Sequence, residues 1–71
     1  MKKCHVRNNI RELRARADEM TQQQLADRIG VTRQTVVAIE REKYSPSLEV
    51  AFRIAAVFGV GLDEVFRFDP D

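Results

Sequence analysis

The sequence predicts an all-α protein built from five short helices, and three observations support this fold class. The segment from Thr21 to Glu40 has the caps and the apolar spacing of two helices joined by a tight turn. The segments from Asn9 to Asp18 and from Leu48 to Phe58 also carry apolar residues at helical spacing. The chain has 71 residues, the size of one domain, so we expect residues 1–71 to fold as a single unit.

The first half of this helix-turn-helix segment predicts a helix with defined ends. Thr21 and Gln24 form a capping-box pair, in which a hydroxyl and an amide satisfy backbone donors at a helix start. Leu25 and Ile29 lie four residues apart and therefore share one face. Gly30 can adopt the left-handed conformation that ends a helix.

The second half predicts a helix that exposes a polar face. Thr32 is placed to cap its start, and Val36 and Ile39 form an apolar stripe that faces inward. The outward positions are Arg33, Gln34, Val37 and Arg41. Arg and Gln side chains match the edges of guanine and adenine in the major groove, and a valine can pack against the methyl group of thymine. This outward face therefore suits the bases of double-stranded DNA.

Two further helix starts carry capping residues. The first helix is expected from Asn9 to Asp18, with Asn9 as its N-cap and Glu12 in the reciprocal capping position. Its buried stripe consists of Ile10, Leu13 and Ala17. Ser47 is placed to cap the helix that begins at Leu48.

The segment from Leu48 to Phe58 is apolar on nearly all sides, because only Glu49 and Arg53 are charged. Such a helix must be buried nearly all round, which is difficult in a chain whose single core supplies only about 3 to 5 kcal/mol. We therefore expect part of it, with a fifth helix from Val60 to Phe66, to meet a second subunit in a homodimer. The residues placed at this interface are Phe52, Val57, Leu62, Phe66 and Phe68.

Charge is unevenly distributed, although the formal net charge is only +1. Residues 1–43 carry ten Lys or Arg against six Asp or Glu, whereas residues 44–71 carry two against five. The basic half contains the predicted helix-turn-helix, so that half can approach phosphate while the other half faces away. A lopsided distribution that arises by chance remains the alternative.

The composition, 44% hydrophobic and 32% charged, is that of an ordinary soluble globular protein. The sequence has neither a signal peptide nor an apolar run of membrane-spanning length, so we expect a cytoplasmic protein with no membrane partner. Cys4 is the only cysteine and cannot form an internal disulfide, which fits a reducing compartment.

One set of positions carries a family resemblance: Leu25, Ala26, Ile29, Gly30, Val31, Val36 and Ile39. These positions match the helix-turn-helix pattern of the Xre family, which includes the phage lambda and 434 repressors and Cro. The segment from Ile39 to Phe66, IEREKYSPSLEVAFRIAAVFGVGLDEVF, resembles the small single-domain members, so nearly the whole chain is covered. The resemblance implies a lambda-repressor-like fold with a short antiparallel β ribbon from the two termini, here residues 4–7 and 66–69.

The resemblance also implies a sequence-specific DNA-binding transcriptional regulator, most often a repressor that binds an inverted-repeat operator as a homodimer. By family position, the base-reading residues are Thr32, Arg33, Gln34 and Val37. The residues expected to contact phosphate are Gln22, Arg41, Lys43, Tyr44 and Ser45. In an alternative reading, Tyr44 seals the core under its loop. Arg14 and Glu40 match a family ion pair that orients the recognition helix, with two independently solvated charges as the alternative.

The chain departs from the family pattern at two places. The turn between Ala17 and Thr21 is one residue longer and lacks the usual glycine, so that Met20 takes a core leucine position and Glu19 is the extra residue. Relatives commonly have Asn or another polar group at the position of Val37. The valine removes a hydrogen bond and should shift the base preference toward thymine.

Other classes of function have less support. An enzyme is not expected, because the chain has one histidine, no phosphate-binding glycine loop and no recognisable pair of catalytic carboxylates. No cofactor, metal or small-molecule effector is expected either. Cys4 and His5 could form a zinc site across a dimer, but neighbours on a strand point to opposite faces. An antitoxin or another protein-interaction module with this fold remains the alternative function.

Overall fold

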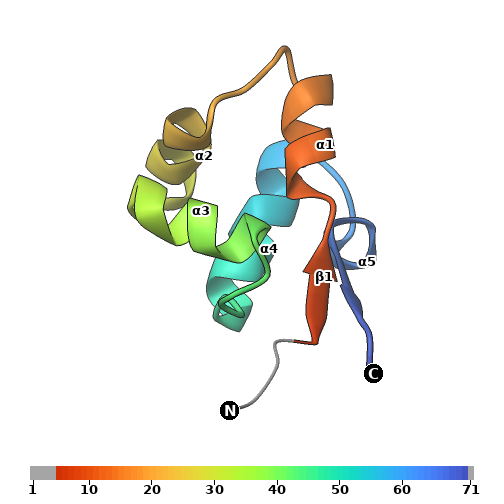
Figure 1. Ribbon diagram of the computed structural model, residues 1–71. Coiled ribbons are helices and arrows are strands. Elements are labelled where there is room, and N and C mark those ends of the chain that lie inside the picture. Colours follow the sequence, from red (N-terminus) through yellow and green to blue (C-terminus); the bar gives the residue numbers. More distant parts are fainter. Residues whose placement is uncertain (1–4, 71) are drawn as a thin grey trace.

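The computed structural model describes residues 5–70, which form five helices and a two-stranded sheet (Figure 1). In chain order the elements are β1 (Val6–Asn8), α1 (Ile10–Arg16), α2 (Gln22–Ile29), α3 (Arg33–Glu40), α4 (Leu48–Phe58), α5 (Leu62–Val65) and β2 (Phe66–Phe68). The predicted fold class, five helices with a short antiparallel ribbon, is confirmed.

Three of the helices begin at a residue with a hydroxyl group, as predicted. The side-chain oxygens of Thr21, Thr32 and Ser47 accept hydrogen bonds from the N–H groups three residues later, at 3.0, 3.2 and 3.2 Å. At Thr21 the capping box is complete, because Gln24 Oε1 accepts a hydrogen bond from the Thr21 N–H at 2.8 Å. These caps define where α2, α3 and α4 start.

α1 begins differently, and the capping box predicted at Asn9 and Glu12 is wrong. Asn9 has φ −116° and ψ 25°, outside the extended region typical of a capping residue, and its amide donates to the Glu64 carbonyl oxygen at 3.2 Å. The Glu12 carboxylate instead accepts a hydrogen bond from the guanidinium of Arg16, one turn later in α1, at 2.8 Å. The Ile10 N–H donates to Asn8 Oδ1 at 3.1 Å, so a side chain of β1 caps α1.

α1 also ends earlier than predicted, at Arg16 rather than Asp18. Asp18 and Glu19 have φ angles of 59° and 58°, so the chain turns through two residues in the left-handed region without a glycine. The longer turn still delivers Met20 to the core, where it is buried as predicted.

The two strands bring together the ends of the described chain. β1 and β2 pair antiparallel, with Val6 opposite Phe68 and Asn8 opposite Phe66. The predicted fifth helix includes Phe66, but this residue is extended (φ −123°, ψ 151°) because its backbone pairs with β1. The strand predicted at residues 4–7 starts at Cys4, which is outside the described range. β1 lies at residues 6–8, so it ends one residue later than predicted.

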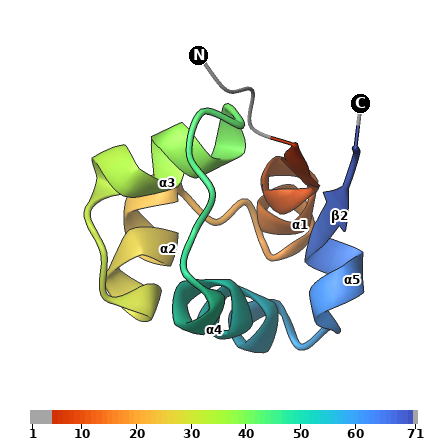
Figure 2. The same ribbon diagram turned by 90° about the horizontal axis from the view of Figure 1, so that it is seen from below.

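All five helices contribute to one core. Figure 2 shows α2 and α3 on one side, α1, α5 and β2 on the other, and α4 along the edge between them. The largest fully buried side chains are Ile10, Leu25, Ile29, Val36, Ile39, Ile54 and Val65. α4 buries only its inner stripe, whereas Leu48 and Phe52 remain 67% and 54% exposed. The nearly complete burial expected for α4 is therefore not reached within one chain.

Gly30 and Gly59 end α2 and α4 in the left-handed conformation, with φ angles of 77° and 66°. A Cβ at position 59 would meet nothing within 4 Å, whereas one at position 30 would lie 3.2 Å from Arg53 Nη1, which donates to the Ile29 carbonyl oxygen.

We expect Gly59→Ala to lower the free energy of unfolding by about 1 kcal/mol through backbone strain. Gly30→Ala should cost about 1 kcal/mol more, through the disturbed hydrogen bond. Urea unfolding measures both, and equal losses would show that the Arg53 contact contributes nothing.

Candidate nucleic-acid interface

α3 turns one face to the core and the opposite face to solvent. Its buried residues are Val36 and Ile39. The exposed positions at its start are Thr32, Arg33 and Gln34, followed one turn later by the half-buried Val37. Because successive helical residues are about 100° apart, Val37 follows Arg33 on the same side. The residues predicted to read bases thus share the solvent side of α3 and its cap.

A hollow of about 350 Å³ lies between the exposed face of α3, the start of α2 and α1. It is lined by Arg11, Gln22, Arg33, Val37, Glu40 and Arg41. The structure thus brings Gln22, predicted to hold phosphate, beside two predicted base-reading residues. Arg11 is an addition to the predicted site. Its sequence signal is the spacing from Arg14, because residues three apart share a helix face.

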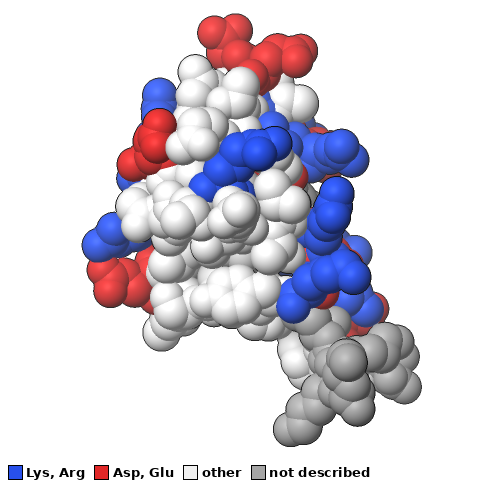
Figure 3. All heavy atoms as spheres, turned by 60° about the vertical axis from the view of Figure 1, so that its left-hand side comes forward, with Lys and Arg blue, Asp and Glu red and all other residues white. Residues whose placement is uncertain are grey.

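Cations around this hollow are available to meet another charge. Three that line it, Arg11, Arg33 and Arg41, form no ion pair or side-chain hydrogen bond with a described residue, and neither does Lys43 in the loop after α3. Arg28 and Arg67 are also unpaired within the described range but belong to α2 and β2. Figure 3, which faces α2 and α3, shows the largest cluster of Lys and Arg from the middle of the surface to its right edge, with acids mainly at the top and left. Such a surface attracts phosphate.

Glu40, in the last turn of α3, is held by two side chains. Arg14 donates to its carboxylate through Nε and Nη2 at 2.6 and 3.0 Å, and Gln22 Nε2 donates at 3.1 Å. Arg14 also donates to the Met20 carbonyl oxygen at 2.8 Å. The Arg14 and Glu40 side chains are only 13% and 8% exposed, so they form a largely buried ion pair rather than two solvated charges. The pair connects α1, the start of α2 and the end of α3.

Gln22 and the loop after α3 contain the other residues predicted to contact phosphate. One N–H of the Gln22 amide is used by Glu40, which leaves the second for a ligand. Lys43 and Ser45 are exposed, and Tyr44 is 50% exposed. The alternative in which Tyr44 seals the core is wrong, because its ring is not among the residues that form or cover the core.

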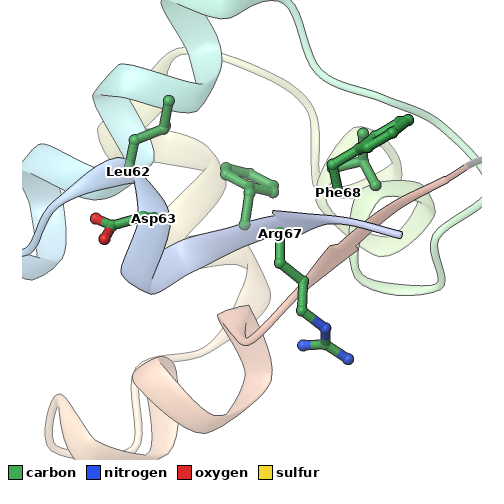
Figure 4. Close-up of a pocket in the computed structure, with 6 residues that line it drawn as sticks. Leu62, Asp63, Arg67 and Phe68 are labelled. Carbon is green, nitrogen blue, oxygen red and sulfur yellow. The ribbon is translucent and has the colours of Figure 1, made fainter. Parts of the chain in front are cut away.

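A second, apolar hollow of about 430 Å³ lies beside α5 and β2 (Figure 4). Its lining consists of Val6, Leu62, Asp63, Phe66, Arg67 and Phe68. In Figure 4, Leu62 and Phe68 project to one side of the chain, and Asp63 and Arg67 to the other. Three of the predicted interface residues meet here, whereas Val57 lines a separate hollow beside α1 and Phe52 lines neither.

His5 lies beside the end of β2, where its Nδ1 is 3.0 Å from the Asp69 carbonyl oxygen. Cys4, the other residue of the zinc alternative, is outside the described residues. Among residues 5–70, no group of three or more His, Cys, Asp or Glu side chains is placed to hold a metal ion. None of the helices in that range combines the length and apolar character that crossing a bilayer requires.

Comparisons with known proteins agree with this geometry. A helix-turn-helix family model matches residues 10–65. An uncharacterized HTH-type transcriptional regulator of Archaeoglobus fulgidus is 46% identical over 66 residues, which are 93% of this chain and 92% of the relative. The cryptic phage CTXphi transcriptional repressor RstR of Vibrio cholerae is 36% identical over 58 residues, which are 82% of this chain and 51% of the repressor.

A solved structure shows the same fold at lower sequence identity. A Bacteroides fragilis chain classed as a DNA-binding protein superposes with a TM-score of 0.77 at 22% identity, covering 87% of this chain and 98% of that one. The matched motif, the capped helix pair and the exposed face of α3 lead to one conclusion. The chain belongs to the Xre-type helix-turn-helix family of DNA-binding transcriptional regulators.

Proposed function

We propose that this protein is a repressor that binds an inverted-repeat operator as a homodimer, with α3 of each subunit in the major groove. The observation that carries the proposal is the exposed start of α3, where Arg33 and Gln34 stand beside cations that no described acid neutralises. The similarity to RstR, which is a transcriptional repressor, supports repression as the direction of control.

Base readout is assigned to Thr32, Arg33, Gln34 and Val37. Residues near the N-terminus of a recognition helix are the ones that reach base edges. Arg33 can form a paired contact with guanine, and Gln34 can do so with adenine. Val37 lies one turn later at the edge of the hollow, where its methyl groups can pack against the methyl group of thymine.

Phosphate contacts are assigned to groups around the base-reading face. These are Gln22, Arg41, Lys43, Tyr44 and Ser45, to which the geometry of the hollow adds Arg11. Gln22 starts α2, where backbone N–H groups and the helix dipole favour an anion. The cations position the protein on the duplex without reading its sequence. Two copies of α3 in successive major grooves would lie about 34 Å apart, on half-sites about ten base pairs apart.

The second subunit is assigned to the apolar hollow beside α5 and β2. Phe68 is 69% exposed there, and a chain of this size gains stability when such surface is covered. Asp63 and Arg67 line the same hollow, and neither side chain bonds to a described residue. A two-fold axis can bring Asp63 of one subunit to Arg67 of the other, which makes the surface complementary to itself. The proposed interface centres on Leu62, Phe66 and Phe68, since Phe52 and Val57 lie elsewhere.

Selection of binding sites from random duplexes tests the proposal as a whole. We expect an inverted repeat with half-sites about ten base pairs apart. Binding to it should weaken steeply as salt is raised, because phosphate contacts release counterions. If no sequence were enriched, operator recognition would be wrong, and an interaction module such as an antitoxin would become the better interpretation.

Arg33→Ala and Gln34→Ala should each cost about 1 to 3 kcal/mol of binding free energy on the selected operator and little on random DNA, because each removes a base contact. Lys43→Ala should weaken binding to both DNAs by a similar factor, since a phosphate contact carries no sequence information. Fluorescence anisotropy titrations measure all three variants. Base readout by α3 would be contradicted by equal losses on operator and random DNA for every variant.

Glu40→Leu should lower the free energy of unfolding by about 3 kcal/mol, because it leaves the Arg14 charge largely buried without a carboxylate. The double variant Arg14→Met/Glu40→Leu should recover much of this loss, since no uncompensated charge remains. If the ion pair orients α3, the double variant regains stability but not operator affinity. Urea unfolding and operator titration measure the two effects, and a double variant with full operator affinity would limit the pair to a structural role.

Phe68→Lys should raise the dissociation constant of the dimer roughly tenfold or more, because it places a charge in the proposed interface. Phe52→Lys is the matched control, since Phe52 is a similarly exposed phenylalanine outside the hollow. Sedimentation equilibrium measures the dimer in both variants. If Phe52→Lys dissociated the dimer and Phe68→Lys did not, the interface would lie on α4 instead.

A further inference from the structure

Asn8 in β1 bonds to both ends of the helical unit that carries the DNA-facing surface. Its Oδ1 accepts a hydrogen bond from the Ile10 N–H at the start of α1, at 3.1 Å. Its Nδ2 donates to the Ile39 carbonyl oxygen in the last turn of α3, at 2.8 Å. Its backbone N–H donates to Glu42 Oε2 at 3.4 Å. One residue of the terminal ribbon is therefore joined to α1, to α3 and to the loop that follows α3.

Glu42 is the partner of this ribbon in the loop after α3. Its φ angle is 61°, in the left-handed region that residues other than glycine rarely adopt. This backbone conformation therefore needs support from other contacts. That support is available from the ribbon, because Glu42 Oε1 accepts a hydrogen bond from Arg7 Nη1 at 3.2 Å in addition to the contact with Asn8. The Glu42 side chain is 30% exposed, so these contacts are only partly shielded from water.

The backbone at Glu42 determines where two of the cations proposed to meet phosphate are placed. Arg41 and Lys43 are its chain neighbours, and both are exposed. The N–H of Glu42 donates to the Ile39 carbonyl oxygen at 2.9 Å, and that of Lys43 donates to the Ala38 carbonyl oxygen at 3.0 Å. The loop therefore continues the last turn of α3 in one defined direction, and a change at Glu42 would alter that direction.

We infer that Glu42 and Asn8 are positioning residues for DNA binding, which hold the end of α3 and the Arg41 to Lys43 loop against the terminal ribbon. The inference rests on the proposed operator recognition by α3. Glu42 lies between Arg41 and Lys43 on the DNA-facing side, and its negative charge alone would oppose binding to phosphate. The inference is that Glu42 nevertheless favours operator binding, because it positions its neighbours. Neither residue needs to touch DNA for this effect.

Charge and position make opposite predictions for the variant Glu42→Gly. If Glu42 acted only through its charge, its removal would strengthen binding to every DNA, because it would remove repulsion from phosphate. If Glu42 positions the loop, its removal weakens operator binding although the repulsion is gone. Glycine also accepts the positive φ angle without strain, so the variant should fold.

Glu19→Gly is the matched control. Glu19 has nearly the same φ angle, 58°, and lines a hollow beside Gln22 on the DNA-facing side, but its side chain forms no bond to a described residue. The control therefore removes the same charge and the same backbone strain without breaking a side-chain contact. Glu42→Gln is the conservative variant, because its one amide oxygen can still accept one of the two hydrogen bonds, from Arg7 or from Asn8.

The experiment measures affinity for the selected operator and for a random duplex, at one salt concentration and at a temperature where circular dichroism shows each variant folded. We expect Glu42→Gly to weaken operator binding by about 3- to 10-fold, the range of one or two lost hydrogen bonds. Random-duplex binding should weaken as well, because the displaced Arg41 and Lys43 are assigned to phosphate. Glu42→Gln should lose less operator affinity than Glu42→Gly, because it can keep one of the two hydrogen bonds. Glu19→Gly should lose none.

Operator binding by Glu42→Gly as tight as in the unmodified protein, or tighter, would overturn the inference. An equally large loss in Glu19→Gly would do the same, because it would show that the contacts of Glu42 are not the cause. Failure of the proposed function looks different. In that case the unmodified protein itself shows no preference for any duplex, so there is no operator on which the variants could be compared.

Discussion

The ion pair between Arg14 and Glu40 joins α3 to α1, and we propose that the placement of α3 depends on it. A carboxylate at the C-terminal end of a helix is disfavoured by the helix dipole, and its burial adds a desolvation cost. Both effects are offset because Glu40 accepts two hydrogen bonds from Arg14 and one from Gln22. The three side chains come from α1, α2 and α3, and their contact joins these helices. In the proposed account, this contact sets the direction in which the exposed face of α3 points.

The pairing of charges within the fold explains how a chain with a net charge of +1 presents a basic surface. Arginines that hold the structure together are engaged with carboxylates, as Arg14 is with Glu40 and Arg7 with Glu42. Around the hollow beside α3, in contrast, Arg11, Arg33 and Arg41 have no acidic partner among the described residues. Glu40 and Glu42 are thus used where they organise the fold, and three of the unpaired arginines lie where phosphate is expected. Local pairing, rather than net charge, determines the field that DNA would meet.

Much of the fold could be predicted because it depends on residues close together in the chain. The cap at Thr21 and the bounds of the helix from Leu48 to Phe58 follow from patterns within one or two turns. The contacts of Asn8 could not be predicted in this way, since Ile39 and Glu42 are 31 and 34 residues distant and a better local capping pattern stood one position later. The base-reading residues could be proposed from the family motif, whereas Arg11 required the packing of α1 beside α2 and α3.

The central claim is that the Arg14 and Glu40 pair holds α3 in place while the first turn of α3 reads DNA. An NMR titration of isotope-labelled protein with the selected operator duplex tests it most directly, because arginine Nε signals report each guanidinium separately. We predict that Arg33 Nε and the backbone amides of the first turn of α3 shift most on binding. Arg14 Nε should keep its free-state position, since it remains bonded to Glu40. Largest shifts in α4, with Arg33 unchanged or Arg14 displaced, would contradict the claim.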